Sequence, residues 1–566
     1  MSCQKQFFFL SALILASAGF SPSVVYAQAP DFDGHLAAGE FGLAAQIAEN
    51  AGPEKRDALL ARVAAAQRNF GAPGASFSTL RSIQDDRTRL GAVDAFRNGP
   101  ARGGAAQADF DSLIELITST IAPQSWDEVG GAGAIDGFDG GVYVDSAGVM
   151  RRMKFAPATN RLLTARSQSQ QTQQNNDARR ESRLRKVSLN RLERELQLLE
   201  LQGKAPTETM RNLAGLQQIQ YVFVYPDTGD VVIAGPASDW IADQEGRQVG
   251  VKSGKPVLQL DDFVVLLRNA YEEKGRFGCS ITPTQAGLAR TQKFLAESSQ
   301  KAIRPSQRDE WLDNFRATLG KQDIVVYGVD PKTRVGKVLV EADYRMKLVG
   351  MGLEEGTLGV VSYLDSVTPG PDGSLPDMNV LRWWFTLNYK AIQASKSRDA
   401  YALQGQGVKV LSENEMLTER GERKHTGKSS VLNLQFANSF TKHFPALAAK
   451  YPVYAELRNI FDLALVAALI RAEDIPNRVN WHPSHLLDKQ RYRPAVGVAP
   501  TRVESIVNYR VIDKKHFIAG VSGGVTVDTS QLVNRGAIAE SDYGLLKAER
   551  QAGTQVKLSD DAWWWD

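Results

Sequence analysis

The stretch Tyr221-Val222-Phe223-Val224-Tyr225 is followed by Pro226-Asp227-Thr228-Gly229-Asp230 and then by Val231-Val232-Ile233-Ala234. Valine, isoleucine, phenylalanine and tyrosine favour strands, and a segment of Pro, Asp, Thr and Gly between two such runs is typical of a turn. The stretch therefore predicts a β-hairpin.

Strands and helices follow this hairpin in blocks. We expect a helix at 260–271, because Asp261 and Asp262 would lie in its first turn, where the helix dipole favours acidic side chains. Similar patterns predict strands at 277–281, 324–327, 335–344, 381–389, 407–411, 503–512 and 516–527, and helices at 189–199, 432–448 and 453–472. Because strands and helices do not strictly alternate, the chain is expected to be α+β, with a mixed antiparallel-sheet and helix core.

The composition is that of a multidomain globular protein. The chain has 566 residues, of which 43% are hydrophobic and 23% charged. Its 67 basic and 64 acidic residues give a net charge of only +3, which argues against a dedicated nucleic-acid-binding protein.

The N-terminus has the pattern of a secretory signal over residues 1–29. Lys5 precedes an apolar run at 7–18, and Ala27 and Ala29 supply the small residues of a cleavage site after either of them. An uncleaved N-terminal anchor is the alternative. No later apolar stretch reaches membrane length, so we expect an exported protein in the periplasm or outside the cell, with no transmembrane span after signal removal.

Composition and periodicity divide the rest of the chain. The expected segments are a helical hairpin at 30–70, a linker at 71–106, a small α/β module at 107–155, a Gln-rich and basic linker at 156–185, an α+β subdomain at 186–300, the main α+β domain at 301–527 and a C-terminal tail at 528–566. Near residues 107–146, the string from Ile121 to Gly131 resembles a small module found beside secretin-type short N-terminal domains in bacterial envelope proteins.

Three sequence features resemble reactive or ligand-binding sites, but none fits one. Gly427-Lys428-Ser429 has Glu422 where a phosphate-binding loop needs glycine. His482 and His485 flank Pro483, which disfavours a continuous helix, so surface or capping histidines are expected and neither a metal nor a cofactor is predicted. Cys279, the cysteine left after signal removal, is expected to be a buried and inert thiol.

The densest cluster of charged residues lies between Val338 and Lys347. Read as a strand, this segment places Glu341, Asp343, Arg345 and Lys347 on one face. Glu341 and Asp343 are thus the candidate catalytic carboxylates, and a salt-bridged, solvated sheet face is the structural alternative.

The tryptophans at the C-terminus are candidate binding residues. Trp563, Trp564 and Trp565 lie on a polar tail, and exposed tryptophan can stack on a sugar or contact a partner protein. The alternative is a tail that packs back on its own domain.

Seven motifs occur in one order and resemble a family of large exported planctomycete proteins catalogued only as a domain of unknown function. They are Tyr221–Pro226, Ile233–Pro236, Pro256–Asp262, Gly278–Ile281, Val340–Lys347, Arg382–Phe385 and Pro452–Asn459. The resemblance covers residues 186–527. It implies export and a shared fold, and it brings no activity, cofactor or catalytic residue.

Two hypotheses about function remain. The first is a non-catalytic, envelope-associated scaffold that binds an envelope protein or polymer. The second is an exported hydrolase of a cell-wall or surface polymer that uses Glu341 and Asp343. The sequence does not decide whether the protein is an enzyme, although the missing motifs favour the first hypothesis.

Overall fold

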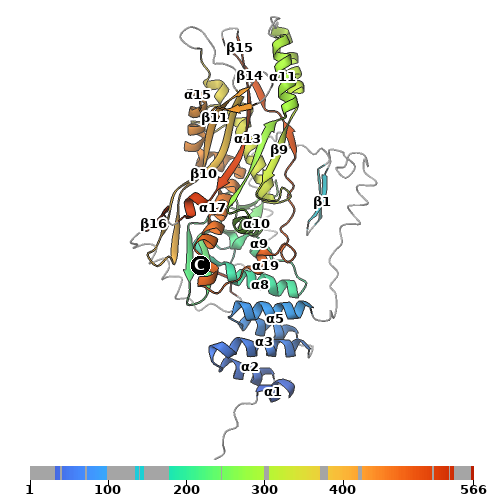
Figure 1. Ribbon diagram of the computed structural model, residues 1–566, viewed down its shortest axis with the longest axis vertical. Helices are drawn as coiled ribbons and strands as arrows, with labels where there is room; N and C mark the ends of the chain where they lie inside the picture. The colour runs from blue at the N-terminus through green and yellow to red at the C-terminus, as the bar shows by residue number, and fades with distance from the viewer. Residues whose placement is uncertain are drawn as a thin grey trace, which may run out of the picture. The chain divides into compact units, whose positions relative to one another are not determined.

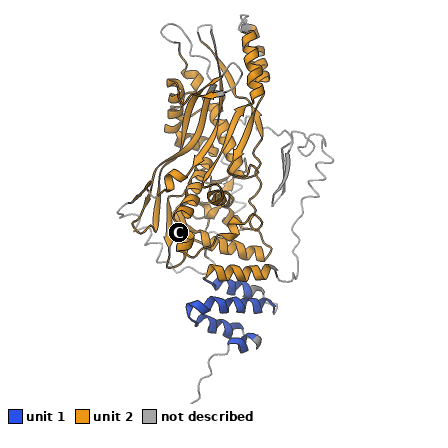
Figure 2. Cartoon of the chain, in the orientation of Figure 1, with its two compact units in different colours: residues 1–84 blue, residues 85–566 orange. Residues whose placement is uncertain are grey.

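The computed structural model describes residues 32–38, 41–69, 73–98, 134–138, 141–145, 178–243, 245–298, 305–369, 380–417, 423–512, 515–534, 536–540 and 562–566. They belong to two compact units, Met1–Gln84 and Asp85–Asp566 (Figure 2). The expected signal segment, 1–29, lies outside the described residues. Of the module at 107–155, the structure describes an antiparallel pair, β1 (Ala134–Phe138) and β2 (Gly141–Asp145).

The first unit consists of helices. They are α1 (Phe32–Ala38), α2 (Phe41–Glu49), α3 (Pro53–Asn69) and α4 (Pro73–Ser82). The expected hairpin is present as α2 and α3, and buried hydrogen bonds attach α4 to it: Ser76 Oγ donates to Ala64 O over 2.8 Å, and Thr79 Oγ1 donates to Gln67 Oε1 over 2.8 Å.

The prediction of a linker at 71–106 is wrong for two segments, because residues of α4 and α5 (Asp86–Asn98) form helices. Helix α5 belongs to the second unit, where Asp86 and Arg89 form an ion pair that is almost fully buried and Arg89 also donates to Gln197. The abundance of Gly, Ala and Ser suggested a linker, but buried polar contacts hold these segments as helices.

A single large sheet dominates the second unit (Figure 1). Among the described residues it has thirteen strands. Their order is β13 (Arg502–Glu504), β9 (Lys321–Tyr327), β8 (Arg276–Pro283), β15 (Lys515–Asp528), β10 (Val380–Ala394), β11 (Ala400–Leu417), β4 (Tyr221–Tyr225), β5 (Asp230–Ala237), β3 (Ser182–Ser188) and β17 (Trp564–Trp565), with β12 (Arg423–His425) beside β11, β14 (Val507–Ile512) beside β15 and β16 (Ile538–Glu540) beside β10. Strand β10 runs parallel to β15 and β16, and the other pairs of this sheet are antiparallel.

Helices pack against this sheet and against one another. They are α8 (Leu189–Leu201), α9 (Glu208–Arg211), α10 (Leu260–Glu272), α11 (Gln285–Ser298), α12 (Arg308–Leu319), α13 (Arg334–Gly350), α14 (Tyr363–Ser366), α15 (Val431–Lys442), α16 (Phe444–Lys450), α17 (Pro452–Ala472), α18 (Ile475–Arg478), α19 (Ser484–Leu487) and α20 (Ser530–Val533), with short 3₁₀ turns at Leu213–Gly215 and Pro305–Gln307 and a small β6 (Trp240–Ala242) and β7 (Gln248–Gly250) pair. The α+β prediction is confirmed. None of the described helices is long and apolar enough to cross a membrane.

The larger part of the core lies on one face of the sheet, and a smaller separate cluster of buried residues includes Phe223 and Trp565. Trp383 and Phe385 of β10 are fully buried in the larger part. The Trp383 ring packs 4.3 Å from that of Phe436 on α15, and Phe385 packs 5.9 Å from Tyr454 on α17. Strands from 186–300 and from 301–527 share this sheet, and β16 and β17 from the expected tail join it.

The expected strand at 335–344 is wrong, because these residues lie in helix α13. The Thr333 side chain caps the helix by accepting from the backbone N–H of Gly336. Nearly every residue from Val338 to Gly350 is buried, polar ones included, so the alternation of charged and apolar letters does not separate a solvent face from a core face.

Candidate functional site

The two candidate carboxylates do not share a face. Two residues along an α-helix are separated by about 200° of rotation, so Glu341 and Asp343 leave α13 in opposite directions. Glu341 forms an ion pair with Arg247, whereas Asp343 is fully buried with its Oδ2 atom 2.6 Å from Lys347 Nζ. The structure therefore does not bring the two together as an acid–base pair.

Glu341 belongs to a partly buried ionic cluster built from four parts of the chain, in which Asp262 and Glu456 are the buried members. Arg247, which precedes β7, donates to Glu341 and, over 2.9 Å, to Glu456 on α17. Arg334 at the start of α13 donates to Glu456 and to Asp262 on α10. Two guanidinium groups thus hold three carboxylates, and the cluster connects α10, α13 and α17 through charge-assisted hydrogen bonds.

Burial and charge pull the carboxyl pKa values of this cluster in opposite directions. Burial raises the pKa of Asp262 to about 7, although Arg334 acts to lower it. For Glu456 burial also raises the pKa, but Arg334 and Arg247 outweigh it and the net pKa is lowered. Each carboxylate is in contact with a guanidinium, so the cluster is suited to holding helices together.

Asp343 on α13 and Cys279 on β8 are both buried, and they lie near each other. Burial raises the pKa of Asp343, and Lys347 offsets part of this effect. Burial also raises the pKa of the Cys279 thiol, with the nearby Asp343 carboxylate acting in the same direction. The expected burial of Cys279 is confirmed, and a thiol with a raised pKa is a poor nucleophile.

The tryptophan triplet packs on its own unit, which corrects the expectation of a docking tail. Strand β17 pairs with β3 through Trp564 and Trp565. Trp563 and Trp565 are only 6% and 7% exposed, and the Arg185 guanidinium lies 4.6 Å over the Trp564 ring. These side chains contribute to the fold and offer little surface to a partner.

The two histidines also have structural partners. His485 is buried, contrary to the expectation of a surface or capping residue. Burial is the main cause that lowers the pKa of its imidazole to about 3, and nearby arginines act in the same direction. His482 Nε2 accepts from Arg87 over 3.0 Å.

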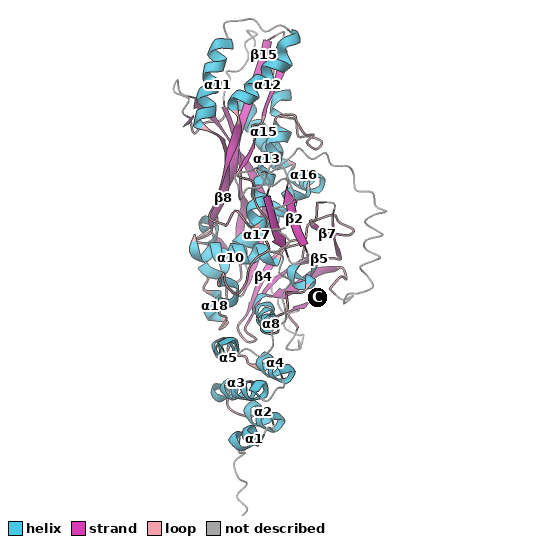
Figure 3. Cartoon of the chain, turned by 90° about the vertical axis from the view of Figure 1, so that its right-hand side faces the viewer, coloured by secondary structure: helices cyan, strands magenta, loops and turns pink. Residues whose placement is uncertain are grey.

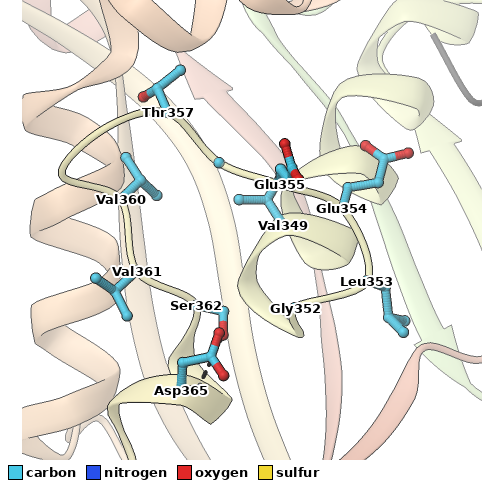
Figure 4. A pocket seen from close by; sticks show the side chains of 11 residues that line it. Val349, Gly352, Leu353, Glu354, Glu355, Thr357, Val360, Val361, Ser362 and Asp365 are labelled. Atoms are coloured by element: carbon cyan, nitrogen blue, oxygen red, sulfur yellow. Dashed lines mark hydrogen bonds between the residues drawn. The ribbon is translucent and has the colours of Figure 1, made fainter.

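A pocket of about 310 Å³ lies between the end of α13 and α14 (Figure 4). Its volume is at the lower end of the range for small-molecule sites. The Ser362 and Asp365 side chains that line it form the N-cap of α14, and Glu354 pairs with Arg345 over 3.0 Å. Three of the polar side chains that line the pocket, those of Ser362, Asp365 and Glu354, are thus used in a cap and an ion pair.

One face of the sheet carries a different kind of surface. Leu411, Trp384, Gly524, Ser280 and Val325 are successive register partners on β11, β10, β15, β8 and β9. They form a continuous row about 19 Å long at the usual strand spacing. We call this row, together with Tyr327 on β9, the open sheet face.

The open sheet face points away from the core. Val325 is 58% exposed, Tyr327 40% and Leu411 39%, whereas the alternate residues of β10 are buried under α15 and α17. In Figure 3, α13, α15 and α16 lie to one side of β8. Among the described residues, helices α11 and α12 pack on the outer side against Val507, Tyr509 and Ile518.

The sequence analysis did not identify this face. Its residues come from five strands that are distant in the chain, and none of them forms a local motif. Trp384 is the one residue whose position in the sequence points to this face, because neighbouring Trp383 and Trp384 must point to opposite faces of a strand.

Comparison with known proteins finds one domain-sized match. Residues 279–363 match the model of a family described as "Protein of unknown function (DUF1598)". The match runs from β8 to α14 and includes β9 and α13. No curated protein and no solved structure matches the chain. The chain therefore contains a domain of unknown function, as its motifs indicate.

Proposed function

We propose that the protein is an exported, non-catalytic component of the cell envelope that binds a partner protein through the open sheet face. The observation that carries this proposal is the row of register partners with exposed Val325 and Leu411 at its two ends. Large exposed apolar side chains occur at interaction sites, and between Val325 and Leu411 the row contains the half-buried Trp384, buried Gly524 and the polar Ser280. Export to the periplasm or beyond follows from the signal pattern at 1–29.

A protein partner fits this surface better than a polysaccharide. Sugar rings bind by stacking on an open aromatic face. The Arg382 guanidinium lies 4.4 Å over the Trp384 ring and occupies one face of it. The exposed aliphatic side chains of Val325 and Leu411 are suited to packing against apolar side chains of a protein.

The alternative, a hydrolase of a wall or surface polymer, has no specific observation in its favour. Its candidate carboxylates, Glu341 and Asp343, lie in separate ion pairs on opposite sides of α13.

The test compares two surface variants of the tagged full-length protein, expressed in its own cell type, cross-linked and fractionated. Val325→Lys/Leu411→Lys places two charges on the open sheet face. Leu358→Lys is the matched control, because Leu358 is 97% exposed and lies elsewhere. We expect the double variant to recover about tenfold less of the wild-type partner, as a loss of about 1.4 kcal/mol would produce. The control should recover it normally.

Equal recovery of the partner by both variants would contradict the proposed surface. Recovery of the wild-type protein as a free monomer would contradict the scaffold role itself. Retention on purified wall polymer, lost in the double variant, would contradict the choice of a protein partner. Circular dichroism of each variant checks that the sheet is intact.

A further inference from the structure

Strands β11 and β12 bring two carboxylates and an imidazole to one place. Glu413 and Glu415 are two residues apart on β11, so their side chains leave the same face of the strand. His425 is the direct cross-strand partner of Glu415. The ligand atoms of all three residues lie within 4.8 Å of one another.

The spacing of these atoms is that of ligands around one metal ion. His425 Nδ1 lies 3.2 Å from Glu413 Oε2 and 3.1 Å from Glu415 Oε1. Atoms bound to a common zinc ion at 2.0–2.2 Å are separated by about 3.0–3.6 Å in ordinary coordination geometries. Two of the three separations in this group therefore match those of ligands around one ion.

Neighbouring donors already orient both carboxylates. The backbone N–H of Gly427 donates to Glu413 Oε1 over 2.7 Å, and Ser522 Oγ donates to Glu415 Oε2 over 3.2 Å. Glu413 Oε2 and Glu415 Oε1 face His425, and Arg382 also donates to Glu413 Oε2 over 3.0 Å. Such outer hydrogen bonds are what positions metal ligands in known sites.

Burial and charge also agree with a cation. Glu415 is 1% exposed and Glu413 6%, whereas the His425 side chain is 62% exposed, so an ion can reach the group from solvent. Arg382 lies 3.0 Å from Glu413 Oε2 and neutralises one of the two carboxylates. The group thus retains one formal negative charge when His425 is neutral.

We propose that Glu413, Glu415 and His425 bind a divalent transition-metal ion of the zinc class, with the remaining coordination positions open to solvent. Carboxylate oxygen and imidazole nitrogen together suit zinc and its neighbours better than calcium or magnesium, which prefer oxygen ligands alone. Metal binding at this site does not require the proposed partner, and Arg382 connects the site to the open sheet face because it contacts both Glu413 and the Trp384 ring.

The test measures Zn²⁺ binding by the full-length protein, carrying a tag without histidines, in equilibrium dialysis with metal quantification. The wild type should bind one Zn²⁺ per chain saturably. His425→Ala should weaken binding by about tenfold or more. His35→Ala, which removes a histidine from the first unit, should bind like the wild type.

A further variant is expected to strengthen Zn²⁺ binding rather than weaken it. Arg382→Gln removes the competing cation while keeping a polar side chain, so it should bind Zn²⁺ several-fold more tightly. No saturable Zn²⁺ binding by the wild type, or equal binding by His425→Ala, would overturn the proposal. Saturable binding of Ca²⁺ in place of Zn²⁺ would also overturn it. Because His425 is mostly exposed, its variant is expected to fold, and thermal unfolding without metal verifies this.

Discussion

Asp343 and Lys347 lie one turn apart on α13, with 2.6 Å between the Asp343 Oδ2 and Lys347 Nζ atoms, and both side chains are fully buried. Lys347 Nζ also donates to the carbonyl of Ile281 on β8 over 3.3 Å. The pair thus joins the helix to the sheet, and its charges depend on each other because no water reaches them.

Removing one charge of this pair should be costly. We expect Asp343→Asn to lower the free energy of unfolding by about 3–5 kcal/mol, because it leaves the Lys347 ammonium buried without its counter-ion. Asp343→Asn/Lys347→Met should recover much of the loss. Urea denaturation of the double-mutant cycle measures the coupling, and Glu297→Gln is the control.

The control pair has the same spacing in an exposed place. Glu297 and Lys293 lie 4.0 Å apart on α11, with 69% and 80% of their side chains exposed. Breaking the Glu297–Lys293 ion pair should lower the free energy of unfolding by less than about 0.5 kcal/mol. Equal effects of the two single substitutions would show that the burial of Asp343 has no energetic consequence.

The raised pKa of Asp262, about 7, predicts a pH-dependent stability. The folded chain binds this proton more tightly than the unfolded chain, so the contribution is fully present below about pH 4 and is lost as the pH rises through about 7. The amide of Asp262→Asn does not ionise, so the variant lacks this loss of stability at rising pH. The stability of the variant relative to wild type should therefore increase from about pH 5 to about pH 8, by up to 1.4 kcal/mol per pH unit.

Urea unfolding at those two pH values measures this change. Asp323→Asn on the surface of β9 serves as the control, because it changes one carboxylate without opening the ionic cluster. A difference between Asp262→Asn and wild type that is constant with pH would contradict the raised pKa.

Because the C-terminal tryptophans are packed, shortening one of their side chains is expected to lower the stability of the fold. Trp565→Ala should lower the free energy of unfolding by about 3 kcal/mol, since a buried large side chain is removed. Trp384→Ala, at a half-buried position on the open sheet face, should cost clearly less. Chemical denaturation of both variants decides this, and equal effects would argue against a packed tail.

Cys279 should resist alkylation in the folded protein. Its thiol is buried and its pKa is raised, so little thiolate is present or accessible. Iodoacetamide at mildly alkaline pH should leave Cys279 unmodified, and the same treatment in urea should modify it fully. Peptide mass analysis reads this one residue, and rapid modification of the folded protein would contradict the inference.

Local patterns predicted most of the sheet correctly. The hairpin of β4 and β5 and the strands β8, β10, β14 and β15 lie where β-branched runs and turn residues indicate. Strand β10 alternates between buried and half-buried residues, whereas β4 and β5 are buried at almost every position and are recognised by their β-branched and aromatic residues.

Helix α13 shows why the same reasoning fails in the core. Its charged residues are buried in pairs with Arg247, Lys347 and Glu354, so they do not mark a solvent face. A strand pattern and a buried helix then look alike in the sequence, and the helix with its Thr333 cap is recognised only in the structure.

The candidate sites were less predictable than the fold. Glu413 and Glu415 lie two apart on a strand and His425 follows ten residues later, a spacing that suggests a shared site only once the register of β11 and β12 is known. The open sheet face likewise depends on pairing between segments far apart in sequence.

The position of β15 also has a consequence for how the chain folds. It lies between β8 and β10 and runs parallel to β10, yet its residues, 515–528, are made long after residues 276–283 and 380–394. Until β15 arrives, both earlier strands expose unpaired backbone edges, and such long-range pairing is slow and prone to aggregation. A translating ribosome must therefore release most of this unit before the centre of the sheet can close, so the late synthesis of β15 sets the point at which the sheet can be completed.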